Sequence, residues 1–103
     1  EIEALGKKYP WYFKTIIPKG TYKGQEQDVV TVAVANILVT REDMPEDVIY
    51  NLTKALYDNH AQLVQAHKAA ADMKLEDGLK GITGVVELHP GAAKFFKEKG
   101  VLK

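Results

Sequence analysis

The sequence predicts one α/β domain in which about two main strands are packed by about three helices. An almost uninterrupted apolar run, rich in β-branched residues, extends from Val29 to Val39. Such runs are typical of strands that are covered on both faces. A helix start signal and an apolar repeat of three and four residues follow this run. The 103 residues are enough for one domain with one hydrophobic core.

The first strand is predicted at about residues 9–17, where apolar and polar residues alternate after a stretch, residues 1–8, that reads as the last turns of a helix. Pro10 is compatible with the beginning of a strand or with an edge. Residues 18–28 contain one proline and two glycines and are predicted to form a loop. Because this loop is longer than most connections, we expect it either to be functional or to cover an edge.

The second strand is predicted at about residues 29–40, and a long helix at about residues 45–66. Asp43 and Glu46 have the spacing of a capping box, in which the Asp side chain accepts from a first-turn N–H and the Glu side chain reaches back. The apolar repeat is strongest up to about residue 59. The helix either ends there or continues, straight or with a kink, to about residue 66.

Two further helices are predicted, a short one at about residues 76–80 and a last one at about residues 90–99. The last helix opens with a proline and is followed by Gly100, where a left-handed residue is expected. Phe96 and Val101 occupy the two positions whose contact accompanies a Schellman ending. The helix end is therefore specified by several local signals.

Composition disfavours several classes of function. Fourteen basic residues balance fourteen acidic ones without forming a block, so neither nucleic acid nor an anionic membrane is an expected partner. There is no cysteine and no serine, and no glycine-rich phosphate loop or other cofactor motif. His60 and His67 are seven residues apart and His89 is distant, which is not the spacing of a helical zinc site. We therefore predict no metal, no cofactor and no enzymatic activity.

Two side chains stand out as candidates for binding. Tyr22 is the only large aromatic residue of the predicted 18–28 loop, whereas the alternating aromatic residues of the 9–17 strand are more typical of packing. Asn36 places an amide inside the most apolar segment. It either closes a β-bulge through a local hydrogen bond or lines a cleft, and the sequence favours neither reading.

Two blocks of sequence carry a resemblance to a known family. They are IPKGTYKGQEQDVVTVAVANILVTREDMPEDVIYNLTKAL at residues 17–56 and LHPGAAKFFKEKGVL at residues 88–102. Together they resemble the C-terminal part of a TAXI-type solute receptor, the binding protein of a TRAP (tripartite ATP-independent periplasmic) transporter. The similarity extends over essentially the whole chain and is looser at residues 67–82.

The resemblance implies that residues 1–103 are the C-terminal segment of a two-lobed periplasmic-binding-protein type II fold, whose export signal lies outside this chain. Such a receptor is periplasmic or extracytoplasmic, closes on a small organic acid or amino acid, and delivers it to membrane subunits. The second strand would cross between lobes, which makes Thr21, Tyr22 and Asn36 candidates for ligand binding. Without its cover, the apolar strand would favour self-association of the chain. The alternative is a small stand-alone protein-interaction module that uses an exposed sheet edge.

Overall fold

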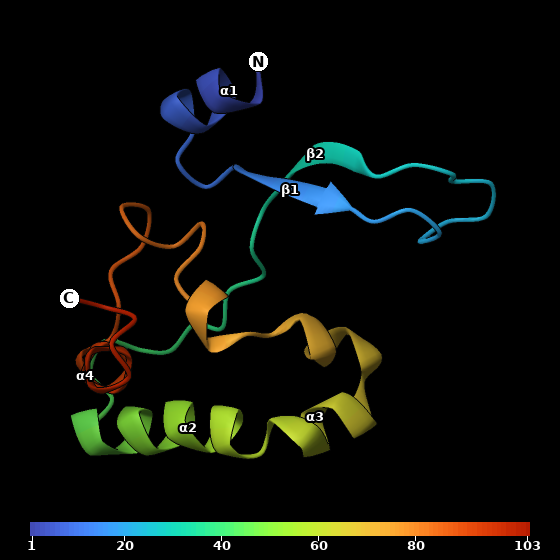
Figure 1. Cartoon of the computed structure of the whole chain (residues 1–103). Coiled ribbons are helices and arrows are strands. Elements are labelled where there is room, and N and C mark those ends of the chain that lie inside the picture. The colour runs from blue at the N-terminus through green and yellow to red at the C-terminus, as the bar shows by residue number, and fades with distance from the viewer. The chain divides into compact units, whose positions relative to one another are not determined.

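The computed structural model describes all residues from Glu1 to Lys103 (Figure 1). The chain is an α/β protein with four α-helices and one two-stranded antiparallel sheet. It forms two compact units, of which unit 1 comprises Glu1–Ile37 and Lys80–Val86 and unit 2 comprises Leu38–Leu79 and Glu87–Lys103. No helix is long and apolar enough to cross a membrane. In chain order the elements are α1 (Ile2–Lys8), β1 (Phe13–Ile17), β2 (Val29–Ala33), α2 (Glu46–Asp58), α3 (His60–Ala66), the 3₁₀ turns η1 (Lys68–Asp72) and η2 (Leu75–Asp77), and α4 (Pro90–Glu98).

Unit 1 is built on the β1–β2 ribbon. The register is continuous, from Phe13 opposite Ala33 to Ile17 opposite Val29. On one face the ring of Phe13 lies against Gly81, whose φ of +71° is a conformation that favours glycine; a Cβ at Gly81 would lie 3.1 Å from the ring. Phe13 is thereby held in place by a segment distant in sequence.

Both predicted strands are too long. Residues 9–12 do not extend the first strand, because the Tyr12 N–H donates to the Tyr9 carbonyl at 3.0 Å and the chain turns there. The second strand ends at Ala33. The rest of the predicted strand is not covered on both faces in this chain, since its residue Leu38 is 75% exposed. The second strand is short because the backbone groups of a strand need hydrogen-bonding partners, and β1 provides partners for only five residues.

The core of unit 2 lies between α2 and α4. Phe95 is 1% exposed, and Ile49 and Phe96 are also buried. The ring of Tyr57 stacks on that of Phe95, with 5.5 Å between centroids and 16° between planes. In Figure 1, α2 lies across the view and α4 is seen end-on beside its first turns. Four aromatic and aliphatic side chains therefore hold the two helices together.

The two helices approach most closely at Gly91. A Cβ at this position would lie 2.6 Å from the Tyr50 nitrogen and would also overlap the Glu46 carbonyl oxygen, both of which are backbone atoms. Only glycine fits this contact without a shift of one helix. Tyr50 adds a second link between the helices, since its hydroxyl donates to the Glu98 carboxylate at 2.6 Å.

The predicted capping box is wrong. Helix α2 begins two residues later than a cap at Asp43 requires, its N-cap is Pro45, and no side chain caps it. Asp43 instead accepts from the guanidinium of Arg41, with 2.9 Å between Nε and Oδ1. This pair engages both carboxylate oxygens of Asp43. Glu46 and Asp47 still lie in the first turn, where negative charge is favourable.

The long helix predicted at residues 45–66 is two helices, α2 and α3, separated at Asn59. The Asn59 side chain donates to the Ala55 carbonyl at 2.8 Å and so occupies an acceptor at the end of α2. The short helix predicted at residues 76–80 is instead the 3₁₀ turn η2, which ends at Asp77. Gly78 follows it and packs closely against the core, since a Cβ there would lie 2.6 Å from the Tyr57 hydroxyl.

Both ends of α4 are closed by local interactions. Gly100 has φ +74°, its N–H donates to the Lys97 carbonyl, and the Val101 N–H donates to the Phe96 carbonyl at 3.0 Å. These two bonds form a Schellman motif. At the other end His89 Nδ1 accepts from the Gly91 N–H at 3.1 Å while its Nε2–H donates to the Met44 carbonyl at 2.8 Å. His89 is thus a neutral cap in one tautomer, and the sequence did not identify it as one.

Candidate binding site

The loop between β1 and β2 is shaped by its own hydrogen bonds. The Gln25 side chain donates to the Ile17 and Gln27 carbonyls at 3.1 and 2.9 Å, and it accepts from the Tyr22 N–H at 3.3 Å. The Asp28 carboxylate accepts from the Lys19 N–H at 2.8 Å. Together with three backbone hydrogen bonds within the loop, these four bonds are typical of a loop that keeps its shape at the tip of a ribbon.

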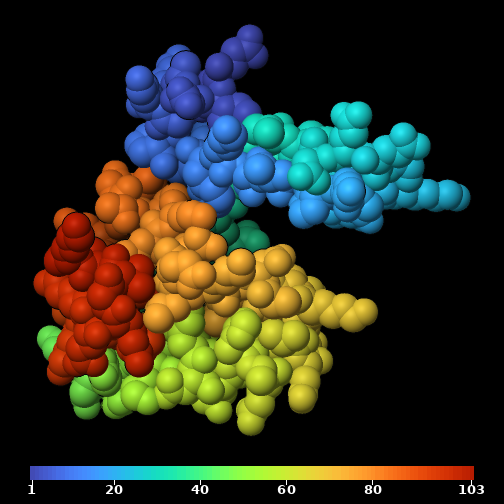
Figure 2. All heavy atoms as spheres, in the orientation of Figure 1, coloured from blue at the N-terminus to red at the C-terminus, as the bar shows by residue number.

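Two of the predicted ligand-binding residues lie in this loop. The Thr21 hydroxyl donates to the Pro18 carbonyl at 2.6 Å, so its proton is used within the loop. Tyr22 is 65% exposed. Figure 2 shows the atoms of the loop, in light blue to cyan, projecting at the tip of the ribbon. The structure therefore presents the Tyr22 ring to solvent and leaves only the lone pairs of the Thr21 hydroxyl for a ligand.

The third predicted residue, Asn36, lies beyond the end of β2 and is exposed. The ladder from Val29 to Ala33 has a continuous register. Asn36 therefore does not close a β-bulge in this sheet, which was one of the two roles that the sequence suggested for it. None of Thr21, Tyr22 and Asn36 lines either of the two hollows described next.

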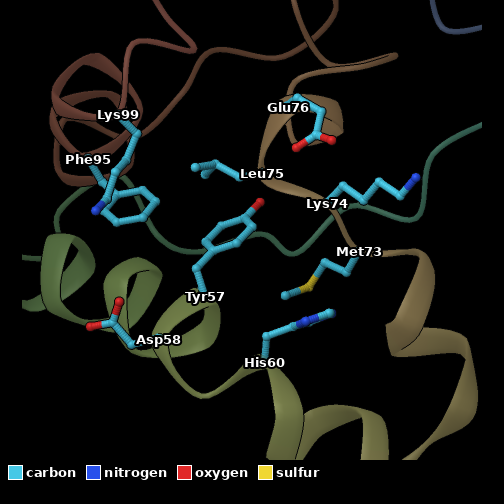
Figure 3. A pocket seen from close by; sticks show the side chains of 9 residues that line it. All are labelled: Tyr57, Asp58, His60, Met73, Lys74, Leu75, Glu76, Phe95 and Lys99. Atoms are coloured by element: carbon cyan, nitrogen blue, oxygen red, sulfur yellow. The ribbon is translucent and has the colours of Figure 1, made fainter.

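The better defined of these hollows lies within unit 2 and has a volume of about 400 Å³. Figure 3 shows the Tyr57 ring at its centre, with Met73 and Leu75 on the side of the 3₁₀ turns and Phe95 on the side of α4. A second hollow of about 460 Å³ lies within unit 1 beside α1, Lys14 and Val30. The lining residues of the unit 2 hollow are Tyr57, Asp58, His60, Met73, Lys74, Leu75, Glu76, Phe95 and Lys99.

The charged groups around the unit 2 hollow differ in their partners. Asp58 is hydrogen-bonded to Lys54, which raises the pKa of the Lys54 ammonium above its usual value. Lys74 and Glu76 take part in no ion pair. The Lys99 ammonium lies 5.8 Å from the centroid of the Phe95 ring, in a cation–π contact. Lys99 is therefore a cation held against the apolar wall without an acidic partner.

Two other polar groups of the hollow have defined states. Burial raises the pKa of the Tyr57 phenol, so this group stays protonated at neutral pH and can donate. His60 donates from Nε2 to the Ala70 carbonyl at 2.6 Å, which ties α3 to η1. No three side chains of the His, Cys, Asp and Glu types gather closely enough to hold a metal ion. The hollow thus combines apolar rings and chains with several charged and polar groups at one place, as sites for small organic molecules do.

Sequence reasoning did not find this hollow. Its members come from α2, α3, the 3₁₀ turns and the end of α4, and only His60 among them was considered as a candidate for a site. Tyr57 and Lys99 are far apart in sequence, and neither belongs to a motif. No local signal could have joined them.

The fold and these features define a class of protein: an α/β chain with solute-sized hollows, consistent with the periplasmic-binding-protein type. Residues 1–100 match the NMT1-like family, and the chain belongs to that family. The family is of the periplasmic-binding-protein type; its proteins bind solutes, are generally not enzymes and are usually extracytoplasmic. Family membership agrees with the sequence resemblance at the level of this class.

Proposed function

We propose that this chain is the C-terminal segment of a TAXI-type receptor, which captures a small organic acid or amino acid outside the cytoplasm for the membrane subunits of a TRAP transporter. The observation that carries the proposal is the match of residues 1–100 to a family of the periplasmic-binding-protein type. The sequence blocks at residues 17–56 and 88–102 support the narrower TAXI assignment.

The apolar segment that follows β2 supports the proposal that this chain packs against further protein in the receptor. Val34 is 55% exposed, and Leu38 and Val39 are exposed to a still greater extent. Exposed apolar side chains that follow one another along a segment are typical of a segment that other protein covers. In a two-lobed receptor, the segment would be covered on both faces, as its composition predicts.

In this proposal, Thr21, Tyr22 and Asn36 contact the ligand. The Tyr22 ring is free to stack on a ligand, and the Asn36 amide can both donate and accept. The Thr21 oxygen retains its acceptor capacity, which suits an ammonium group. A cleft formed by these side chains needs a second wall from the rest of the receptor.

Calorimetric titration of amino acids and dicarboxylic acids tests this proposal in two proteins, the 103-residue chain and the longer receptor that contains it. We expect micromolar binding by the receptor only, and loss of affinity in the receptor when Asn36 is replaced by Ala. An N51A receptor is a matched control, because Asn51 is an exposed asparagine of α2. Micromolar binding by the chain alone would disprove the shared cleft. Unchanged affinity of the N36A receptor would return Asn36 to a structural role.

A second candidate function is a stand-alone interaction module. It is favoured by the two-stranded sheet, in which both β1 and β2 have an outer edge without a partner strand. The open reading frame that encodes the chain distinguishes the two candidate functions. A frame that starts near Glu1 without an export signal supports the module, whereas a longer frame with an export signal supports the receptor.

A further inference from the structure

We propose that the hollow of unit 2 is a binding site for a small aromatic monocarboxylate, a planar apolar body that carries one carboxylate. This site is separate from the cleft of the proposed function, since none of Thr21, Tyr22 and Asn36 lines it. Its volume of about 400 Å³ falls in the range of known small-molecule sites, roughly 300–1,000 Å³.

The walls of the hollow select a flat apolar body. The Tyr57 ring forms one wall, and it is held in place by stacking on the buried ring of Phe95. Met73 and Leu75 lie on the other side, as Figure 3 shows. A methionine thioether packs favourably against aromatic rings and adapts to their shape. An aromatic ring between these walls would be in contact with apolar atoms on both faces.

The charges at the rim select an anion and indicate where it binds. Lys99 lies on the α4 side of the hollow, and Asp58, on α2, is already paired with Lys54. The other two charged lining residues, Lys74 and Glu76, have opposite formal charges that sum to zero. The uncompensated charge of the site is therefore the Lys99 ammonium, which the contact with Phe95 already holds against the apolar wall.

This arrangement assigns a role to each part of the ligand. The carboxylate pairs with Lys99, and the aromatic body extends from there along the Tyr57 ring. The Tyr57 phenol stays protonated and adds a donor for a polar substituent on that body. A carboxylate without an apolar body, such as acetate, would lack the contacts that the walls provide and should bind far more weakly.

The test is a titration of the whole chain with 3-phenylpropanoate, followed by two-dimensional NMR of the backbone amides. We expect saturable binding with shifts centred on Tyr57, Met73 and Leu75. Replacing the ligand by its neutral amide should weaken binding about tenfold, because the amide oxygen can still accept from Lys99 but no longer carries a negative charge. Failure to saturate at about a thousandfold excess of 3-phenylpropanoate over protein would overturn the proposal.

A pair of variants separates a built site from general attraction of an anion. K99Q should weaken 3-phenylpropanoate about tenfold and abolish the preference for the acid over the amide. K97Q makes the same change of charge two residues earlier, in the last turn of α4, but Lys97 does not line the hollow, so the affinity of this variant should equal that of the unchanged chain. Equal weakening in both variants would overturn the proposal. The amino and dicarboxylic acids of the proposed function are different probes, so either idea can fail without the other.

Discussion

The two units differ in how far each one covers its own apolar side chains. In unit 2 the helices α2 and α4 bury Ile49, Phe95 and Phe96 against each other, and both ends of α4 are closed by hydrogen bonds. In unit 1 the ribbon of β1 and β2 has no fully buried side chain, and the cross-strand pair Ile16 and Val30 is 53% and 49% exposed. Unit 2 therefore provides most of the folding energy of this chain.

The difference follows from the kind of element in each unit. A helix satisfies its backbone internally and needs only one apolar stripe to be covered, which a second helix can do. A strand needs partners along its edges and cover on two faces, and two strands are rarely stable without further packing. We infer that the ribbon is the part of the chain that depends on additional protein.

The largest difference is expected when one apolar side chain is truncated in each unit, a buried one in unit 2 and a half-exposed one in unit 1. Phe95→Ala should lower the free energy of unfolding by about 3–5 kcal/mol, since it removes a fully buried ring and leaves a cavity. Ile16→Ala should cost less than about 1 kcal/mol, because that side chain is already half in water. Urea unfolding followed by circular dichroism measures both values. Similar losses in the two variants would mean that the ribbon contributes as much as the helix pair.

The next largest effect is expected at the helix contact. Gly91→Ala places a methyl group against the backbone of α2, and we expect a loss of about 1–3 kcal/mol as the helices separate. Ala92→Gly in the same turn of α4 is the control; it should cost about 0.5–1 kcal/mol through helix propensity alone. A G91A variant as stable as the unchanged chain would show that the approach of α2 and α4 is not close.

What could be predicted from the sequence follows the same division between local and distant partners. The end of α4 depends on Gly100 and on bonds within six residues, so it could be read directly from the chain. The capping box at Asp43 could not, because Arg41 competes for the same carboxylate. The length of β2 could not be predicted either, because it is set by the length of β1 rather than by the apolar run itself.

The candidate sites show the same limit of local signals. Tyr22 and Asn36 attracted attention as exceptions to their surroundings, and their role in ligand binding stays a prediction. The unit 2 hollow contains no such exception: Tyr57, Met73 and Lys99 are ordinary residues in sequence that only the fold brings together. Residues that form a site only because the fold brings them together cannot be recognised from a local pattern in a single sequence.

A third prediction concerns association through the ribbon. The chain has no net charge, and residues 29–39 contain no charged side chain, so neither repulsion nor a gatekeeping charge protects β2. We expect the apparent mass in sedimentation velocity to rise with concentration, and Val30→Lys to restore the monomer. Gln27→Lys adds the same charge in the adjoining loop and should still associate. A strictly monomeric unchanged chain at high concentration would contradict the prediction.

The smallest expected effect is a dependence of stability on alkaline pH that is confined to unit 2. Burial raises the pKa of the Tyr57 phenol in the folded state above its value of about 10 in the unfolded chain. Between these two pKa values the folded state binds more protons, so the free energy of unfolding falls as pH rises above about 10. Tyr57→Phe should make the free energy of unfolding fall less steeply with pH in this range, and it should not change the pH dependence near neutral pH. Tyr22→Phe is the control, because that ring is exposed, and an equal change in slope for both variants would contradict the burial of Tyr57.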